Sequence, residues 1–272
     1  MQNSKSIDEK IPKWSGLISV EDTQLFVTDT GGYGQAIIYL NGSYANQGHW
    51  KRVVEELGSN YRHVLFDERA RGKSKKSHDY SFNACIRDLS TIIKARQIEK
   101  PILVGWSYGA ILAVHWVHSN PNIASGIVAI DSAVPYGLTG DAAKERIYRL
   151  FNKIKLVLPI ASFFGLAARM SAKKHAEINI EINEISANLE PVLLEIRIPV
   201  RYVLANGASR GGEEQEFNAM RESLNPLLIK NQNLKVSAKV ASNHENILSK
   251  DFLAIAKTIS VLAMETNLEL KL

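Results

Sequence analysis

The stretch Pro101-Ile-Leu-Val-Gly-Trp-Ser-Tyr-Gly-Ala-Ile-Leu-Ala-Val114 decides the fold, because a short apolar strand leads through a Gly-x-Ser-x-Gly turn into an apolar helix. Residues 102–104 are typical of a fully buried strand, and residues 108–119 continue with helical character. A serine at such a tight turn is held with its hydroxyl clear of the backbone, since small residues on either side let neighbouring chains come close. The helix directs the partial positive charge of its N-terminus toward Ser107.

The composition is that of an ordinary globular protein. A chain of 272 residues suits one core domain with an inserted subdomain, and 45% hydrophobic residues is a typical share. The chain has 33 Lys and Arg against 28 Asp and Glu, a net charge of +5, and the basic residues are scattered along it. This distribution argues against nucleic acid as a partner.

The cysteine content limits the kinds of site that the chain can form, and its hydropathy indicates where the protein is located. Cys85 is the only cysteine, which excludes a disulfide framework or a cysteine-based metal site within the chain. Residues 1–10 are polar and lack an apolar signal core, and no apolar run is long enough for a membrane span. We therefore expect a cytoplasmic protein whose partner is a small molecule, with a homodimer among the open oligomeric states.

Strand and helix patterns alternate over most of the chain, which predicts a mostly parallel sheet with helices on both faces. Two antiparallel edge strands around residues 17–27 come first and turn at Glu21-Asp22. Buried strands are expected at 36–40, 63–66, 102–104, 127–130, 200–205 and 234–241, and helices at 50–57, 82–93, 108–119, 214–229 and 252–264. Right-handed crossovers would bring the strand ends at Ser43, Ser107 and Asp131 to one edge of the sheet.

The alternation stops between the two parts of the sheet. We assign residues 1–133 to the first part of the α/β core, 134–196 to a helical cap and 197–272 to the second part of the core. Within the cap, residues 161–170 are apolar on all sides. They predict a buried lid helix over an apolar pocket, with contact to a membrane as the alternative.

From about residue 15 to 265 the chain resembles the α/β-hydrolase fold superfamily. Four motifs carry the resemblance, in the expected order: Asn41-Gly42-Ser43, Asp67-x-Arg69-x-x-Gly72-x-Ser74, the turn at Ser107 and a histidine after the last strand, His244. The resemblance implies an eight-stranded, mostly parallel sheet with a helical cap inserted after the sixth strand. It also makes the turn at Ser107 the nucleophile elbow of that family.

The resemblance implies a role for each motif. Ser107 would be the nucleophile, and a serine hydroxyl needs a base within hydrogen-bond reach. His244 is the candidate base because its polar loop follows the last strand, whereas the other six histidines are interpreted as packing, surface or structural residues. The backbone N–H groups of Ser43 and Tyr108 would form the oxyanion hole.

The sequence departs from the family pattern at two places. The oxyanion loop has Asn41-Gly42 where the family commonly has His-Gly, a change that backbone contacts tolerate. The Gly-x-x-Asp expected after the seventh strand is missing from residues 206–212. Some relatives place the acid after the sixth strand, which favours Asp131. The alternatives are Glu213, Glu214 and Glu216, or no acid at all.

Four aromatic residues are candidates for contact with the substrate. Trp106 flanks Ser107, and Tyr44 follows the oxyanion loop. Phe163 and Phe164 in the cap would contact an apolar substrate, with core packing as an equal alternative. The charged turn at Asp67 to Arg71 is expected to support the fold.

These expectations favour a cofactor-independent serine hydrolase, without a metal, that cleaves an ester, lactone or related carbonyl bond of a small, largely apolar substrate through an acyl-enzyme. One alternative is a ligand-binding, receptor-like protein with little turnover. Another is a lyase, acyltransferase or carbon–carbon bond hydrolase on the same scaffold. Haloalkane dehalogenation is disfavoured, because that branch needs a carboxylate where this chain has Ser107.

Overall fold

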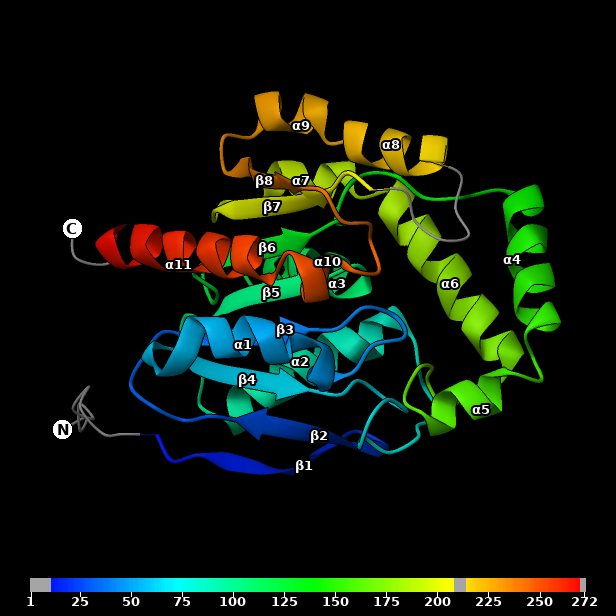
Figure 1. Cartoon of the computed structure of the whole chain (residues 1–272), viewed down its shortest axis with the longest axis horizontal. Helices are drawn as coiled ribbons and strands as arrows, with labels where there is room; N and C mark the ends of the chain where they lie inside the picture. Colours follow the sequence, from blue (N-terminus) through cyan, green and yellow to red (C-terminus); the bar gives the residue numbers. More distant parts are fainter. Residues whose placement is uncertain (1–10, 208–213, 270–272) are drawn as a thin grey trace.

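An eight-stranded sheet forms the centre of the molecule in the computed structural model, which describes residues 11–207 and 214–269 (Figure 1). The strand order is β1-β2-β4-β3-β5-β6-β7-β8. β1 pairs antiparallel with β2 and β2 with β4, and all other neighbours are parallel. The strands are β1 (Trp14–Val20), β2 (Thr23–Asp29), β3 (Ala36–Leu40), β4 (Arg62–Phe66), β5 (Ile102–Trp106), β6 (Gly126–Ile130), β7 (Val200–Ala205) and β8 (Leu234–Val240).

Helices cover both faces of this sheet, so the predicted eight-stranded, mostly parallel α/β architecture is confirmed. The α-helices are α1 (Lys51–Leu57), α2 (Phe82–Ala95), α3 (Tyr108–Ser119), α4 (Asp141–Lys153), α5 (Leu158–Phe163), α6 (Ala172–Ala187), α7 (Glu190–Glu195), α8 (Glu214–Glu222), α9 (Asn225–Lys230), α10 (Ile247–Lys250) and α11 (Phe252–Glu269). Two 3₁₀ turns, η1 (Gln47–Trp50) and η2 (Gly58–Asn60), flank α1.

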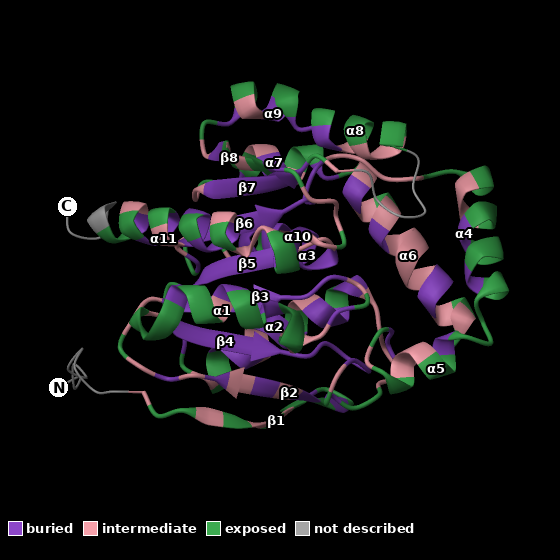
Figure 2. Cartoon of the chain, viewed as in Figure 1, coloured by how far each residue is buried: buried purple, intermediate pink, exposed green. Residues whose placement is uncertain are grey.

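The core lies in two layers, one on each face of the sheet. On one face, Tyr39 and Val104 pack in a cluster with residues of α1 and α11. On the other face, Ile38 and Leu103 pack in a cluster with residues of α2 and α3. The central strands β3 to β7 are buried along their length except at Trp106, the half-buried last residue of β5 (Figure 2), as expected for strands between two helical layers.

Local signals in the sequence explain most element boundaries. The predicted antiparallel pair turns at Glu21, which has a φ of 38°. The prediction of one helix over residues 214–229 is wrong, because α8 and α9 are separate. Pro226 lies at the start of α9, where a residue without an N–H begins a helix easily but disrupts the middle of one.

Between β6 and β7 the described chain contains α4, α5, α6 and α7 and no strand. Helices α4 and α6 pack against each other and stand at one side of the sheet (Figure 1, right). A small apolar cluster joins them to α5, and it includes Ile147, Phe151, Leu158, Ala167 and Ala176. Helix α7 packs instead against α3 and α9, so its contacts are with the core.

The expected buried lid over residues 161–170 is wrong. Phe163 is 84% exposed and Phe164 is 69% exposed. Helix α5 has only six residues, and this region is anchored mainly through Leu158 and Ala167. Leu166 also faces solvent, whereas Met170 is half-buried. Within the described part of the chain, no helix has the length and hydropathy needed to cross a bilayer.

Candidate active site

Ser107 occupies the turn between β5 and α3 in a backbone conformation that residues other than glycine rarely adopt. Its φ is 55° and its ψ is −120°, outside the three main regions allowed to L-residues. The Ser107 N–H donates a hydrogen bond to the carbonyl of Ile130 at 3.1 Å, which fastens the turn to the end of β6. Such strain, maintained by surrounding structure, is typical of a functional site.

The two glycines of the turn are required by close backbone contacts. A Cβ atom added to Gly105 would lie 2.4 Å from the backbone of Gly109 and Ala110. A Cβ atom on Gly109 would lie 2.2 Å from the carbonyl oxygen of Leu40, at the end of β3. The turn is therefore packed directly against the strand that leads into the loop at Asn41-Gly42-Ser43.

Asp131 follows β6 and is fully buried. Its backbone N–H donates to the carbonyl of Val203 at 2.9 Å, and its Oδ1 accepts a hydrogen bond from the N–H of Ala205 at 2.9 Å. Its Oδ2 lies 3.0 Å from Nδ1 of His244. The end of β7 thus aims the Asp131 carboxylate at the histidine after β8.

A cationic side chain contacts the same carboxylate. Arg221 on α8 donates from Nε to Oδ1 at 3.0 Å and from Nη2 to Oδ2 at 3.2 Å. Burial would raise the pKa of the Asp131 carboxyl, but the hydrogen bonds from His244 and Arg221 outweigh burial and hold that pKa below its usual value. Sequence reasoning missed Arg221, because an arginine on a charged helix has no local signal that separates it from a surface residue.

His244 lies in the loop between β8 and α10 and is partly buried. Its ring centroid is 5.7 Å from that of Trp106, the residue before Ser107, and 6.1 Å from that of Phe217. The Trp106 indole N–H donates to the His244 carbonyl at 3.2 Å. With Nδ1 facing Asp131, Nε2 is the nitrogen left to accept a proton. Among the described residues no hydrogen bond joins this ring to Ser107, and contacts of this kind are often long before substrate binds.

The loop after β3 carries Ser43, whose carbonyl accepts a hydrogen bond from Nε of Arg71 at 2.8 Å. Arg71 belongs to the turn that the sequence suggested was structural, and it fixes the orientation of this peptide. A Cβ atom on Gly42 would meet the Trp106 ring at 3.0 Å. Ser43 and Tyr108 both line the cavity that contains Ser107.

Asn41 occupies the position where the family commonly has histidine, and its side chain is fully engaged. Its Nδ2 donates to the Phe66 carbonyl at 2.7 Å and to Glu68 at 2.8 Å, and its Oδ1 accepts from the Trp50 indole N–H at 2.8 Å. Glu68 is buried, and burial raises the pKa of its carboxyl. The hydrogen bonds of the Asn41 side chain therefore hold this loop in place.

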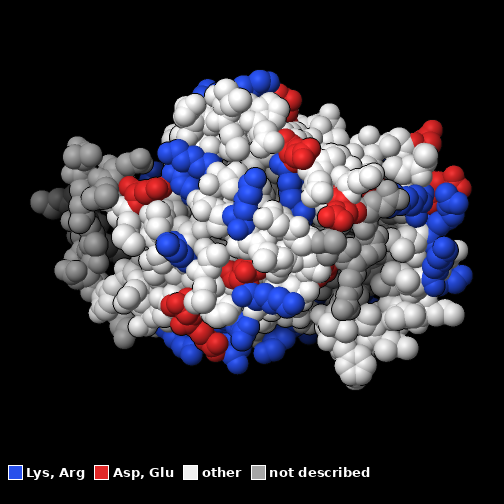
Figure 3. Space-filling view, turned by 45° about the horizontal axis from the view of Figure 1, so that its top comes forward, with Lys and Arg blue, Asp and Glu red and all other residues white. Residues whose placement is uncertain are grey.

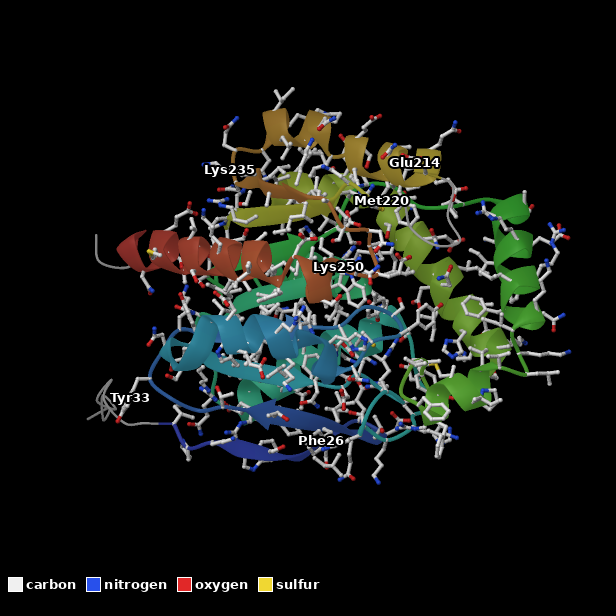
Figure 4. All side chains as sticks on the ribbon, viewed as in Figure 1. Phe26, Tyr33, Glu214, Met220, Lys235 and Lys250 are labelled. Carbon is white, nitrogen blue, oxygen red and sulfur yellow. The ribbon has the colours of Figure 1, made fainter. Side chains whose placement is uncertain are left out.

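The cavity at Ser107 has a volume of about 230 Å³. Its lining is mixed, with polar residues beside apolar ones: Ser43, Ser107, Tyr108, Ile111, Ser132, Tyr136, Leu138, Asn179, Ile182, Asn183, Ser186, Glu216, Phe217 and Met220. Met220, labelled in Figure 4, lies on α8 near one end of α6. The cap residues in this set carry no local signal, because only packing determines which face of α6 points to Ser107.

The four aromatic residues predicted to contact the substrate are absent from this lining. Tyr44 lines a small adjoining hollow together with Ser43 and His175. Trp106 packs over Gly42 and beside His244. The prediction for Phe163 and Phe164 is corrected by their exposure, since both project from the cap into solvent.

The alternative acids that the structure describes form no hydrogen bond with His244. Glu214 is exposed at the start of α8 (Figure 4). Glu216 forms an ion pair with Arg146 at 2.7 Å. Glu213 lies outside the described residues. Of the described carboxylates, only that of Asp131 forms a hydrogen bond with His244.

Comparison with known proteins agrees with this fold. A family profile for the alpha/beta hydrolase fold matches residues 35–192. The AB hydrolase superfamily protein YisY of Bacillus subtilis (strain 168) is 28% identical over 119 residues, which cover 42% of this chain and 44% of that protein. Ethanol acetyltransferase 2 of Hanseniaspora uvarum is 22% identical over 238 residues, which cover 86% of this chain and 63% of that protein. The chain thus spans less than two thirds of the length of these relatives.

Among solved structures, an esterase (EaEST) from Exiguobacterium antarcticum superposes with a TM-score of 0.71 at 17% identity, covering 92% of this chain and 100% of that one. A thioesterase domain from the curacin biosynthetic pathway superposes with a TM-score of 0.66 at 14% identity, covering 92% and 99%. At these identities the likeness shows the fold alone.

Proposed function

The chain belongs to the alpha/beta hydrolase fold family, and on that premise we propose that it is a serine hydrolase with Ser107 as nucleophile, His244 as base and Asp131 as acid. One observation supports the proposal above all others. The buried carboxylate of Asp131 lies 3.0 Å from Nδ1 of His244, beside the strained turn that carries Ser107. A histidine fixed in this way presents its other nitrogen for proton transfer.

In the proposed reaction the Ser107 hydroxyl attacks a carbonyl carbon while Nε2 of His244 takes its proton. The negative charge that develops on the carbonyl oxygen is stabilised by the N–H groups of Ser43 and Tyr108. His244 then gives the proton to the leaving group, and an ester joins Ser107 to the acyl part of the substrate. Water, activated by the same histidine, releases the acid and restores Ser107.

The cavity limits the proposed substrate. Its volume of about 230 Å³ is below the roughly 300 Å³ at which pockets for drug-sized ligands begin. We therefore propose a small ester, lactone or related carbonyl compound. Asn179, Asn183 and Ser186 on α6 add hydrogen-bonding groups to the lining, so the substrate we propose is more polar than the sequence indicated. The proposal includes a cytoplasmic location and no cofactor.

A fluorophosphonate probe tests the nucleophile directly, because it phosphonylates an activated serine. We expect labelling of the wild-type protein at Ser107 and none of Ser107→Ala, together with hydrolysis of p-nitrophenyl acetate that this variant loses. Unlabelled but folded wild-type protein would count against a hydrolase. If a small carbonyl ligand then stabilised the wild type and Ser107→Ala equally, and the wild type formed no product from it, the results would favour a ligand-binding protein.

A second candidate is acyl transfer to an alcohol. Ethanol acetyltransferase 2 matches 86% of this chain, and an acyl-enzyme reacts with an alcohol by the same steps as with water. Addition of ethanol to the assay distinguishes the two activities. Ethyl acetate formed in excess over acetic acid would indicate a transferase, whereas acetic acid as the main product would indicate a hydrolase.

A further inference from the structure

The cap carries a concentration of exposed apolar side chains on one short stretch. Leu156 is 79% exposed and Ile160 is 60% exposed. Phe163 and Phe164 are 84% and 69% exposed. Together with neighbours that are also exposed, they form a surface that we term the cap patch: Leu150, Leu156, Val157, Ile160, Phe163, Phe164 and Leu166. Isolated apolar residues at the surface need no explanation, but several exposed apolar residues within one short stretch favour a binding surface.

The stretch that carries the cap patch contains basic residues and no acidic ones. Residues 146–176 include seven Lys and Arg residues. Glu145 and Glu177 lie just outside the two ends of this stretch and pair with Arg149, Lys173 and Lys174. Lys153 and Lys155 are exposed and lie within the patch, just before Leu156. Figure 3 shows basic and acidic side chains at the right-hand edge of the molecule, where α4 lies in Figure 1, with an uncharged area below them.

This combination selects among the partners that could cover the patch. A symmetric dimer built on it would bring the same patch of two copies together. The basic residues beside it would then repel one another. A bilayer with anionic headgroups satisfies both features, because acyl chains accept the apolar side chains and the headgroups attract Lys and Arg.

We propose that the cap patch docks the protein on the surface of a bilayer that contains anionic lipids. Phe163 and Phe164 enter the boundary between headgroups and acyl chains, and Lys153 and Lys155 contact the headgroups. The segment lies in the interface and does not span the membrane. This inference does not depend on the proposed hydrolysis, because neither phenylalanine lines the cavity at Ser107.

Sedimentation with vesicles tests the proposal. The wild-type protein should sediment with vesicles of equal parts phosphatidylcholine and phosphatidylglycerol, more weakly with phosphatidylcholine alone, and less as salt increases. The double variant Phe163→Ser, Phe164→Ser should lower the partition coefficient about tenfold or more, because it removes two rings from the interface. The variant Lys153→Glu, Lys155→Glu should lower binding to the anionic vesicles only.

Matched controls separate docking from folding and from catalysis. Ile229→Ser removes another side chain that is 79% exposed, on α9, and should leave vesicle binding unchanged. All variants should keep the melting temperature of the wild type. Ser107→Ala should bind vesicles as the wild type does, so a failure of docking and a failure of the hydrolase proposal give different results.

Three outcomes would overturn the proposal. The first is wild-type protein that stays in solution with anionic vesicles. The second is Ile229→Ser weakening binding as much as the double phenylalanine variant. The third is a dimer that dissociates in Phe163→Ser, Phe164→Ser without any binding to vesicles, which would assign the patch to a second copy of the chain.

Discussion

The Asp131 carboxylate is shared between His244 and Arg221, so the arginine affects how strongly the carboxylate interacts with the histidine. Nδ1 of His244 lies 3.0 Å from Oδ2, while Arg221 donates to both oxygens. The arginine neutralises part of the charge that would otherwise stabilise a protonated imidazole. Two predictions at the scale of single residues follow from this arrangement.

Replacement of Asp131 by Asn should lower kcat by about a thousandfold or more, because the amide stabilises the wrong tautomer of His244 and does not stabilise its charged form. Ester hydrolysis by the purified variant measures the effect. Glu214→Gln, which changes an exposed carboxylate at the start of α8, is the matched control and should remain fully active. A fully active Asp131→Asn variant would remove Asp131 from the triad.

Replacement of Arg221 by Met should lower kcat about tenfold to a hundredfold, because the Asp131 carboxylate loses two of the hydrogen bonds that hold it in position against His244. Ester hydrolysis by the purified variant measures the effect. Arg221→Lys keeps the charge and a donor and should recover part of the activity. If Arg221→Met is less stable but fully active, Arg221 has a structural role alone.

At the scale of secondary-structure elements, the contact between β3 and the β5–α3 turn holds Ser107 in place. Gly109 begins its helix directly against the carbonyl of Leu40. Nothing but a hydrogen fits between them. The loop with Ser43 and the helix with Tyr108 therefore keep a fixed separation, which an oxyanion site requires.

Gly109→Ala should destabilise the protein by about 1–3 kcal/mol, since the added methyl group must displace backbone, and activity should fall with it. Thermal melting and ester hydrolysis measure the two effects. Gly140→Ala is the comparison, because its Cβ would meet open space and only its φ of 84° opposes the change. A Gly109→Ala variant as stable and active as wild type would contradict the packing described here.

For the molecule as a whole, buried histidines link stability to pH. Burial lowers the pKa of His63, His115 and His175 from 6.5, and for His115 the pKa falls to about 4. Each group binds a proton more readily in the unfolded chain. Their contribution to stability is therefore complete above pH 6.5 and is lost as pH falls through the folded-state values.

The melting temperature should consequently fall as pH is lowered from 7 to 5, and His115→Phe should make this fall shallower. The ring of His115 packs edge-on against Phe82 at 5.2 Å, so a phenyl group replaces it without opening a cavity. Differential scanning calorimetry across this range measures the slope. His78→Phe, a change at an exposed histidine, is the control. Equal slopes in wild type and His115→Phe would refute this assignment.

The sequence by itself determined the elements around Ser107. Strand patterns, breakers and the Gly-x-Ser-x-Gly spacing are local properties, and they predicted the sheet, the turn and the loops that end at Ser43 and Asp131. The position of His244 after the last strand was equally local. Each of these depends on neighbours within a few residues, where hydrogen bonding and steric contact act directly.

Only the tertiary structure decided what surrounds that site. The pairing of Asp131 with both His244 and Arg221 joins residues about ninety or more positions apart. Which residues of α6 and α8 line the cavity depends on helix packing, as does the exposure of Phe163 and Phe164. An apolar helix face looks the same in sequence whether it is buried or faces solvent, because burial is a property of the partner that covers it.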